Sequence, residues 1–163
     1  MSEKRKSLNE FYDTKVKDVM QMMKSEIPCI DEKADVTVVF NVLNKTDHIW
    51  VMASEEPTKL LGIITESDTI ALLSPPLTSL QSFDKPDPRS LQYGVIMTAG
   101  EIMSKKPVTT SQDEKIKDVL KKMKEQKIKQ LPVVDKNNQL LGEVSLSHLI
   151  QEYSKHLAQN PKI

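Results

Sequence analysis

The feature that most constrains this chain is an internal repeat with a spacing of about 80 residues. The segment LLGIITESDTIALL at 60–73 matches LLGEVSLSHLIQEY at 140–153. Upstream, VKDVM at 16–20 matches AGEIM at 99–103, and IWVM at 49–52 matches LPVV at 131–134. Two of the four glycines, Gly62 and Gly142, occupy equivalent places. Because the matches follow the same order in both halves, we interpret the chain as two copies of one supersecondary unit.

The second copy predicts the order of elements most clearly. Residues 107–110 are expected to form a short strand, and Ser111 with Glu114 has the spacing of a capping box that starts a helix. An apolar stripe at helical spacing follows over 116–123. Strands are expected at 131–135 and 140–144, with a second helix after Ser145. The predicted unit is β-α-β-β-α, which makes this an α/β protein.

The first copy carries weaker signals in the same order. Residues 36–43 are rich in β-branched side chains, but the repeat predicts a helix there. Residues 8–20 are expected to form an N-terminal helix that packs on the module. We therefore divide the chain into 1–73 (N-terminal helix and first repeat), 74–94 (a proline-rich linker) and 95–163 (second repeat and C-terminal tail).

The composition predicts a soluble cytoplasmic protein. Lys plus Arg and Asp plus Glu both number 23, so no net charge draws the chain to nucleic acid or to a membrane. The single cysteine, Cys29, can form no internal disulfide and no metal cluster, and a small buried strand residue is the preferred interpretation. The first residues lack the apolar region of a secretory signal, and no apolar run is long enough to span a membrane.

The motif G-h-h-T-x-x-D at 62–68, where h is apolar, follows the predicted hairpin of the first copy. Together with the duplicated β-α-β-β-α unit and the Leu-Pro-Val strand at 131–133, it resembles the CBS-domain family. The resemblance implies a tandem (Bateman) module in which two CBS repeats pack as a pseudo-twofold pair. It also implies a cleft between the two sheets that binds AMP, ATP or a related adenosine ligand.

The resemblance places Asp68 as the ribose anchor, because a carboxylate can accept hydrogen bonds from both ribose hydroxyls. Thr65 would lie at a helix N-terminus, where backbone N–H groups favour a phosphate, and Ile63 would line the adenine. The alternative is that Thr65 and Asp68 only cap the helix, since they are spaced as an N-cap residue and its third successor.

The rest of the implied ligand site comes from the second copy. Pro107, Val108 and Thr109 would present backbone groups to the adenine edge. A second segment, with Lys129, Gln130 and Pro132, would close over the base and reach the phosphates. Lys129 would bind phosphate through its ammonium group, although a solvated surface lysine is the alternative.

The second motif departs from the family pattern, because His148 stands where the ribose carboxylate belongs. A neutral imidazole cannot accept from two hydroxyls at once. The wall opposite His148 would include 27–30 and 48–50, with Trp50 in place of the usual proline. We therefore expect one good site and one degenerate site.

The function predicted from these features is a non-enzymatic sensor that binds an adenine nucleotide and acts in trans on a protein partner. The sequence contains no Walker lysine motif and no G-x-G-x-x-G, so no catalytic residues, no metal ligands and no required cofactor are assigned. We expect a homodimer without a membrane association. Two alternatives stay open. One is a nucleic-acid-binding or protein-interaction module that uses the lysines of 101–129, and the other is a structural dimer with an apolar seam formed by Val19, Met20, Met22, Met23, Ile102 and Met103.

Overall fold

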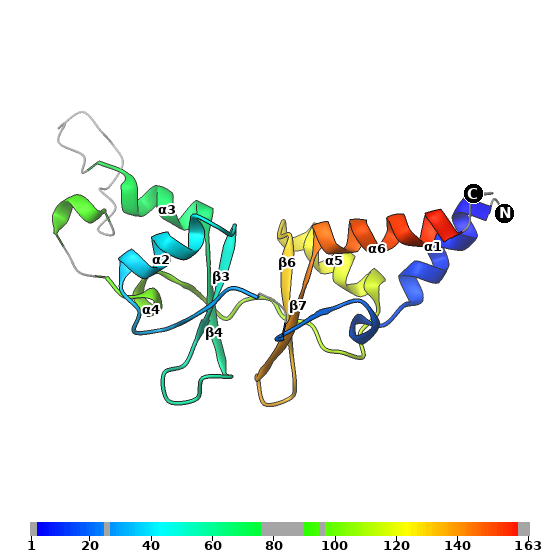
Figure 1. The fold of residues 1–163 in the computed structure, drawn as a ribbon, viewed down its shortest axis with the longest axis horizontal. Helices are drawn as coiled ribbons and strands as arrows, with labels where there is room; N and C mark the ends of the chain where they lie inside the picture. Colours follow the sequence, from blue (N-terminus) through cyan, green and yellow to red (C-terminus); the bar gives the residue numbers. More distant parts are fainter. Residues whose placement is uncertain (1–2, 25–26, 76–89, 95–96, 160–163) are drawn as a thin grey trace. The chain divides into compact units, whose positions relative to one another are not determined.

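A computed structural model describes residues 3–24, 27–75, 90–94 and 97–159 (Figure 1). The chain forms two compact units that do not follow the order of the sequence. The continuous unit comprises residues 28–107, and the split unit joins 1–27 to 108–163. The N-terminal segment thus packs with the second repeat, whereas the sequence division grouped it with the first.

The continuous unit contains a four-stranded sheet in the order β2-β3-β4-β5. Strand β2 pairs parallel to β3, and the other pairs are antiparallel. The helices of this unit and its core cluster, built around Val39, Ile49, Val51 and Ile64, lie at one face of the β3–β4 hairpin (Figure 1). In chain order its elements are β2 (Cys29–Asp31), α2 (Val36–Leu43), β3 (His48–Met52), β4 (Leu60–Thr65), α3 (Glu66–Leu73), the 3-10 helix η2 (Leu91–Tyr93), α4 (Ala99–Ile102) and β5 (Ser104–Lys105).

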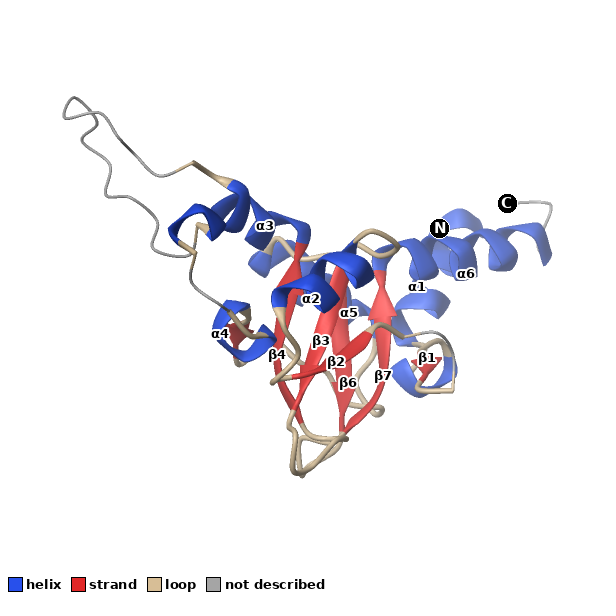
Figure 2. Cartoon of the chain, turned by 60° about the vertical axis from the view of Figure 1, so that its left-hand side comes forward, coloured by secondary structure: helices blue, strands red, loops and turns tan. Residues whose placement is uncertain are grey.

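The split unit contains a three-stranded sheet in the order β1-β7-β6 (Figure 2). Its core is built around Val16, Ile116, Leu131 and Leu149, and α1 packs on α5 and α6. In chain order its elements are α1 (Glu3–Asp13), the 3-10 helix η1 (Val16–Asp18), β1 (Gln21–Met22), α5 (Ile116–Gln126), β6 (Gln130–Val134), β7 (Leu140–Ser145) and α6 (Leu146–Gln159).

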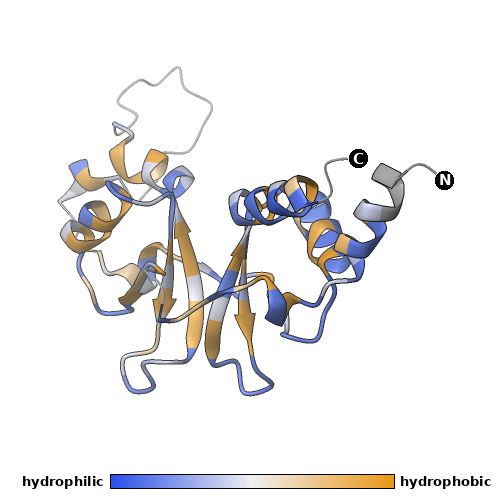
Figure 3. Cartoon of the chain, turned by 45° about the vertical axis from the view of Figure 1, so that its right-hand side comes forward, coloured by the Kyte–Doolittle hydropathy of each residue, from blue (hydrophilic) through white to orange (hydrophobic). Residues whose placement is uncertain are grey.

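The expected β-α-β-β-α repeat is confirmed, and so is the helix at 36–43. Asp35 caps α2 by accepting hydrogen bonds from Thr37 N and Val38 N, and the buried face of the helix outweighs the β-propensity of its residues. Figure 3 shows apolar strands and polar hairpin turns in both repeats, which is the pattern from which the hairpins were predicted. Of the linker expected at 74–94, residues 76–89 lie outside the described part of the chain.

Three local predictions were wrong. The helix expected at 8–20 ends at Asp13, because the N–H groups of Val16 and Lys17 donate to Glu114 O and Gln112 O and not to carbonyls of a continuing helix. The helix expected from Ser111 begins at Ile116 and is preceded by a turn. Within the strand expected at 107–110, only Thr110 forms a bridge, parallel to Val133.

Each leading strand pairs with the hairpin of the other repeat. β1 precedes the first repeat but pairs with β7, where Met22 lies opposite Gly142. β5 precedes the second repeat but pairs with β4, where Lys105 lies opposite Gly62. Of the residues proposed for an apolar dimer seam, Val19, Met20 and Ile102 are buried within the chain. Met22 and Met23 are exposed.

We expect Gly142→Ala to destabilise the split unit. A Cβ at this position would lie 2.1 Å from the carbonyl oxygen of Gln21 and 2.6 Å from Cε of Met20. The backbone of β1 must move to make room, which we expect to lower the free energy of unfolding by about 1–3 kcal/mol. Urea denaturation measures this change. Gly100→Ala is the control, because its nearest contact would be 3.2 Å, and an equal loss in both variants would contradict the close-approach argument.

Candidate functional site

Each hairpin has one face that packs in the core and one that does not. In β3 and β4, Ile49, Val51 and Ile64 belong to the core cluster. Side chains alternate along a strand, so the residues between them point to the opposite face. The residues of this opposite face are His48, Trp50, Ile63 and Thr65, and in the second repeat they are Gln130, Pro132, Glu143 and Ser145. Of these, His48, Trp50 and Glu143 are buried although they lie outside the two core clusters.

Thr65 and Asp68 meet at the start of α3. Oδ2 of Asp68 accepts a hydrogen bond from Thr65 N at 2.8 Å and lies 3.3 Å from Thr65 Oγ1, which also donates to it. The capping role considered for these residues is therefore present. In the part of the chain that the structure describes, the second oxygen, Oδ1, accepts no hydrogen bond, and Asp68 is partly exposed. Capping and ligand binding are thus compatible at this carboxylate, because they use different oxygens.

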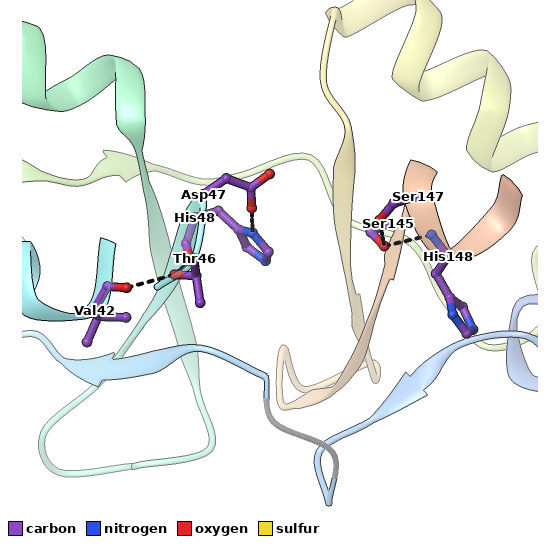
Figure 4. A network of polar contacts seen from close by, with 7 residues as sticks. All are labelled: Val42, Thr46, Asp47, His48, Ser145, Ser147 and His148. Atoms are coloured by element: carbon purple, nitrogen blue, oxygen red, sulfur yellow. Dashed lines mark hydrogen bonds and ion pairs between the residues drawn. The ribbon is translucent and has the colours of Figure 1, made fainter. Parts of the chain in front are cut away.

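In the second repeat, the side chain before the helix accepts the capping hydrogen bond, whereas in the first repeat Asp68 within the helix accepts it. Oγ of Ser145 accepts a hydrogen bond from His148 N at 3.2 Å, so here the residue before the helix caps it (Figure 4). The His148 ring is directed along α6, with Nε2 3.9 Å from Oε1 of Glu152. His148 lies where the fold of the first repeat has Asp68, and the second repeat has no carboxylate at that position.

His48 is a neighbour of Thr65 that the sequence analysis did not associate with it. The two residues are direct cross-strand partners in the β3–β4 pairing. His48 is buried, and its Nδ1 lies 2.6 Å from Oδ1 of Asp47 (Figure 4). Its ring also packs edge-on against Trp50. The strand register of the hairpin places His48 next to Thr65. The sequence of the turn at 53–59 does not indicate that register.

The predicted base-closing segment lies at the corresponding end of β6. Gln130 lies opposite Ser145, and Pro132 lies opposite Glu143. The carbonyl of Lys129 accepts a hydrogen bond from Leu146 N at 2.8 Å, while the residue itself is exposed. These contacts hold the backbone of the segment against the start of α6 and leave the Lys129 ammonium in solvent.

The predicted adenine-contacting segment, 107–109, and the adjacent Thr110 are held by hydrogen bonds to β6 and to Lys122. Both backbone groups of Thr110 bond to β6, because Thr110 N donates to Pro132 O and Val134 N donates to Thr110 O, each at 3.0 Å. Nζ of Lys122 donates to Thr109 O at 2.9 Å and to both carboxylate oxygens of Glu114 at 2.9 and 2.7 Å. The sequence analysis placed Lys122 only among the lysines of the basic helix face, and it assigned Glu114 to a helix cap.

The structure brings the predicted site residues together in two groups. Ile63, Thr65 and Asp68 lie side by side in the continuous unit. Pro107 ends that unit. The second group lies in the split unit and comprises Val108, Thr109, Lys129, Gln130 and Pro132. The single composite site that the resemblance implies stays a prediction.

A cavity of about 560 Å³ opens in the split unit at the turn end of its hairpin. Three of its charged groups are partnered, since Lys122 pairs with Glu114 and Asp135 Oδ1 accepts from the N–H groups of Asn137 and Gln139. Of the predicted ligand residues it includes Thr109 alone. Its lining is 109–114, Lys122, 134–136 and Leu141.

A family model described as the CBS domain matches residues 16–75 and 99–155, which together cover most of the chain. The chain belongs to the CBS-domain family. The matches begin at 16 and 99, before the strands β1 and β5 that each pair with the hairpin of the other repeat. The family pattern therefore includes these leading segments.

Solved CBS structures share the fold. CBSX2 in complex with AMP is 19% identical, with a TM-score of 0.69, and the match covers 86% of this chain and 96% of that one. The CBS domain pair of MJ0100, in complex with 5'-methylthioadenosine and S-adenosyl-L-methionine, is 24% identical, with a TM-score of 0.63 over 87% and 97% of the two chains. At these identities the likeness shows the fold alone.

Curated relatives are much longer proteins. Homoserine O-acetyltransferase from Methanosphaera stadtmanae is 26% identical over 141 residues, which are 86% of this chain and 24% of the relative. Protein SDS23 from Vanderwaltozyma polyspora is 26% identical over 137 residues, 81% of this chain and 26% of the relative. The chain thus spans about a quarter of the length of these relatives.

The charges away from the site are mostly paired or solvated. Four lysines of the predicted basic helix face lie within 4.0 Å of carboxylates, which reduces the charge available to an external phosphate. These pairs are Lys115–Asp13, Lys117–Asp13, Lys121–Glu125 and Lys122–Glu114.

Asp31, at the end of β2 in the continuous unit, has a lowered pKa. The Ser54 hydroxyl and the Lys33 N–H donate hydrogen bonds to its carboxylate and so hold the pKa below its ordinary value.

The described residues include no cluster of three or more potential metal ligands. None of the helices in the described ranges combines the length and apolar composition that crossing a bilayer requires. Cys29 is half-buried in β2, opposite Trp50 in the parallel pairing. This position agrees with the expected strand residue, although the side chain is less buried than predicted.

We expect Asp68→Ala and Asp118→Ala to destabilise the CBS module by similar, small amounts. Asp118 has the same capping geometry in α5, where its Oδ2 accepts from Lys115 N at 3.3 Å. Loss of such a cap lowers the free energy of unfolding by about 1 kcal/mol, and urea denaturation of both variants measures it. A loss several times larger for Asp68→Ala would mean that this carboxylate has a structural role beyond the cap.

Proposed function

We propose that this CBS module is a non-enzymatic regulatory module that binds an adenine nucleotide around Asp68. Proteins of this family are generally regulatory modules, and the proposal adds the ligand and its anchor. The observation that carries it is the Asp68 carboxylate, which caps α3 with Oδ2, while its Oδ1 accepts no hydrogen bond from the described residues. We further propose that the module works as a cytoplasmic homodimer and acts in trans on a protein partner.

The chemistry around Asp68 suits the ribose and phosphate of a nucleotide. A carboxylate oxygen accepts a strong hydrogen bond from a ribose hydroxyl. The first N–H groups of α3 and its dipole favour negative charge near Thr65. Ile63 lies two residues before Thr65 on the same strand face, where it offers an apolar surface to a base.

The second group of predicted residues supplies complementary chemistry. Lys129 has an exposed ammonium group for a phosphate, and Pro132 lies on the non-core face of β6. Adenosine is the moiety common to the ligands named for the solved CBS pairs, which are AMP in CBSX2 and 5'-methylthioadenosine with S-adenosyl-L-methionine in MJ0100. These names support an adenosine compound as the ligand class for this chain.

Calorimetric titration with AMP, ADP and ATP tests the proposal. We expect at least one of these nucleotides to saturate the wild-type chain with one ligand per chain. Asp68→Ala should weaken binding by about tenfold to a hundredfold, because a hydrogen bond to a charged group contributes about 1.5–3 kcal/mol. Asp118→Ala is the matched control, since it removes an equivalent cap on α5 and should leave the affinity unchanged.

Two outcomes separate the function from the site. If no adenine nucleotide binds at millimolar concentration, the nucleotide-sensor function is rejected. If Asp68→Ala binds as tightly as the wild type, the sensor function survives but the assignment of its anchor is wrong. A salt-dependent gel shift with DNA or RNA in the same preparation would favour the nucleic-acid alternative instead.

A further inference from the structure

The cavity of the split unit lies at a place where the two repeats differ in their hydrogen bonding. In the first repeat, β2 pairs with β3 at three positions, and the N–H of Glu32 extends this pairing by donating to Met52 O at 2.9 Å. Ser54 Oγ donates to Asp31 Oδ1 at 2.6 Å, and Ser54 N donates to Glu32 Oε1 at 3.3 Å. These bonds hold the turn of the first hairpin against the end of β2.

The sheet registers identify the equivalent residues of the second repeat. Thr110 pairs in parallel with Val133. Ile30 pairs in parallel with Val51 in the same way, and both valines lie opposite the repeat glycine of the next strand. Thr110 is therefore the counterpart of Ile30, and the helices α5 and α2 both begin six residues after these positions.

The second repeat lacks the bonds that hold the first turn in place. Counting onward from the paired residues, 111–112 is the counterpart of 31–32, and Lys136 is the counterpart of Ser54. In the described part of the second repeat, no hydrogen bond joins 111–112 to the turn at 135–139. Both segments contribute to the lining of the cavity, which thus opens where the first repeat is closed by its turn.

The wall of the cavity is charged where the first repeat is apolar. By the same count, Glu114 corresponds to Ala34, and Lys122 corresponds to Val42. Ala34 and Val42 pack against the core cluster of the continuous unit, whereas Lys122 donates to both carboxylate oxygens of Glu114 at 2.9 and 2.7 Å. The fold of a repeat therefore does not require this ion pair, because packed apolar residues in its place are often neutral or stabilising.

Two adjacent residues of the turn bring unlike charges to the cavity. Oδ1 of Asp135 accepts hydrogen bonds from the N–H groups of Asn137 and Gln139, but within the described part of the chain its Oδ2 accepts none. Lys136 is exposed, and it forms no ion pair with the residues that the structure describes. One carboxylate oxygen and one ammonium group are therefore available to a ligand at this end of the cavity.

A small zwitterion suits this lining. Its ammonium group would donate to Oδ2 of Asp135, and its carboxylate would accept from the ammonium group of Lys136. The lining has three carboxylates and two ammonium groups, which disfavours a purely anionic ligand such as a phosphate. Val134 and Leu141 add an apolar part for an aliphatic side chain. The volume of about 560 Å³ lies in the range of about 300–1,000 Å³ that is typical of small-molecule sites.

We propose that this cavity is a second ligand site, which binds an α-amino acid with an aliphatic side chain through Asp135 and Lys136. The site lies wholly within the split unit, because its lining comes from residues of that unit alone. The inference goes beyond the proposed nucleotide-binding function and does not rest on it.

Titration of the isotope-labelled chain with L-leucine, L-isoleucine and L-valine, followed by NMR, tests the inference. We expect at least one of them to shift the backbone amide resonances of 109–114 and 134–136 in a saturable manner, while those of β4 stay unchanged. The matching amine lacks the carboxylate, and the matching carboxylic acid lacks the ammonium group. Each should bind about tenfold more weakly than the amino acid or worse, because one charged hydrogen bond is lost.

Two variants test the assigned residues. Asp135→Asn removes the negative charge but keeps an oxygen that can accept from the N–H groups of the turn, and Lys136→Met removes the ammonium group. Each should weaken binding of the amino acid by about tenfold. Lys124→Met is the matched control, because Lys124 is exposed on α5 and lies outside the lining of the cavity. Thermal unfolding shows whether the variants are folded, and the comparison of ligands on the wild type requires no variant.

Three results overturn the inference. The first is the absence of a saturable shift with all three amino acids at millimolar concentration. The second is an amine or a carboxylic acid that binds as tightly as its parent amino acid. The third is an unchanged affinity in folded Asp135→Asn and Lys136→Met chains. Because nucleotide binding is measured in a separate titration with AMP, failure of this inference and failure of the proposed function are distinguishable.

Discussion

The architecture depends on the close approach of a short leading strand to a glycine in the hairpin that it joins. Gly142 and Gly62 have no side chain at the point where β1 and β5 cross them, and any Cβ would lie within 2.6 Å of a backbone oxygen. A side chain at either glycine would force the leading strand that pairs there to move. The exchange of segments between the repeats depends on this close approach, and the same pairings accompany the division of the chain into a continuous and a split unit.

The same hairpins place the candidate site. Alternate side chains of each strand pack in the core cluster, so the side chains between them point to the opposite face of the sheet. In both repeats the residue before the second helix lies opposite a polar residue of the first hairpin strand, as Thr65 lies opposite His48 and Ser145 lies opposite Gln130. The two repeats therefore share a scaffold, while only the first has a carboxylate at the start of its helix.

The repeat allowed the sequence to predict most of the fold. It predicted α2 correctly against the β-propensity of its residues, and it placed the hairpin strands to within a residue or two. The leading segments were misplaced because their partners are distant in sequence, and nothing local in 14–17 indicates bonds to 112–116. Ser111 and Glu114 have capping-box spacing, but Glu114 is used by Thr110 and Lys122 instead. For the site, the contact of Thr65 with Asp68 was predictable from spacing, whereas the position of His48 required the hairpin register.

The discontinuity of the split unit has a consequence for the order of folding during synthesis. The continuous unit can complete its contacts once residues 28–107 have left the ribosome, because no element of its sheet comes from elsewhere. Residues of α1 and β1 emerge before the elements that they contact, since α5, α6 and β7 follow more than half a chain later. Until then Phe11, Val16 and Met20, which are buried in the finished unit, remain exposed on the nascent chain. The apolar face of this segment is thus completed only after more than half a chain of further synthesis.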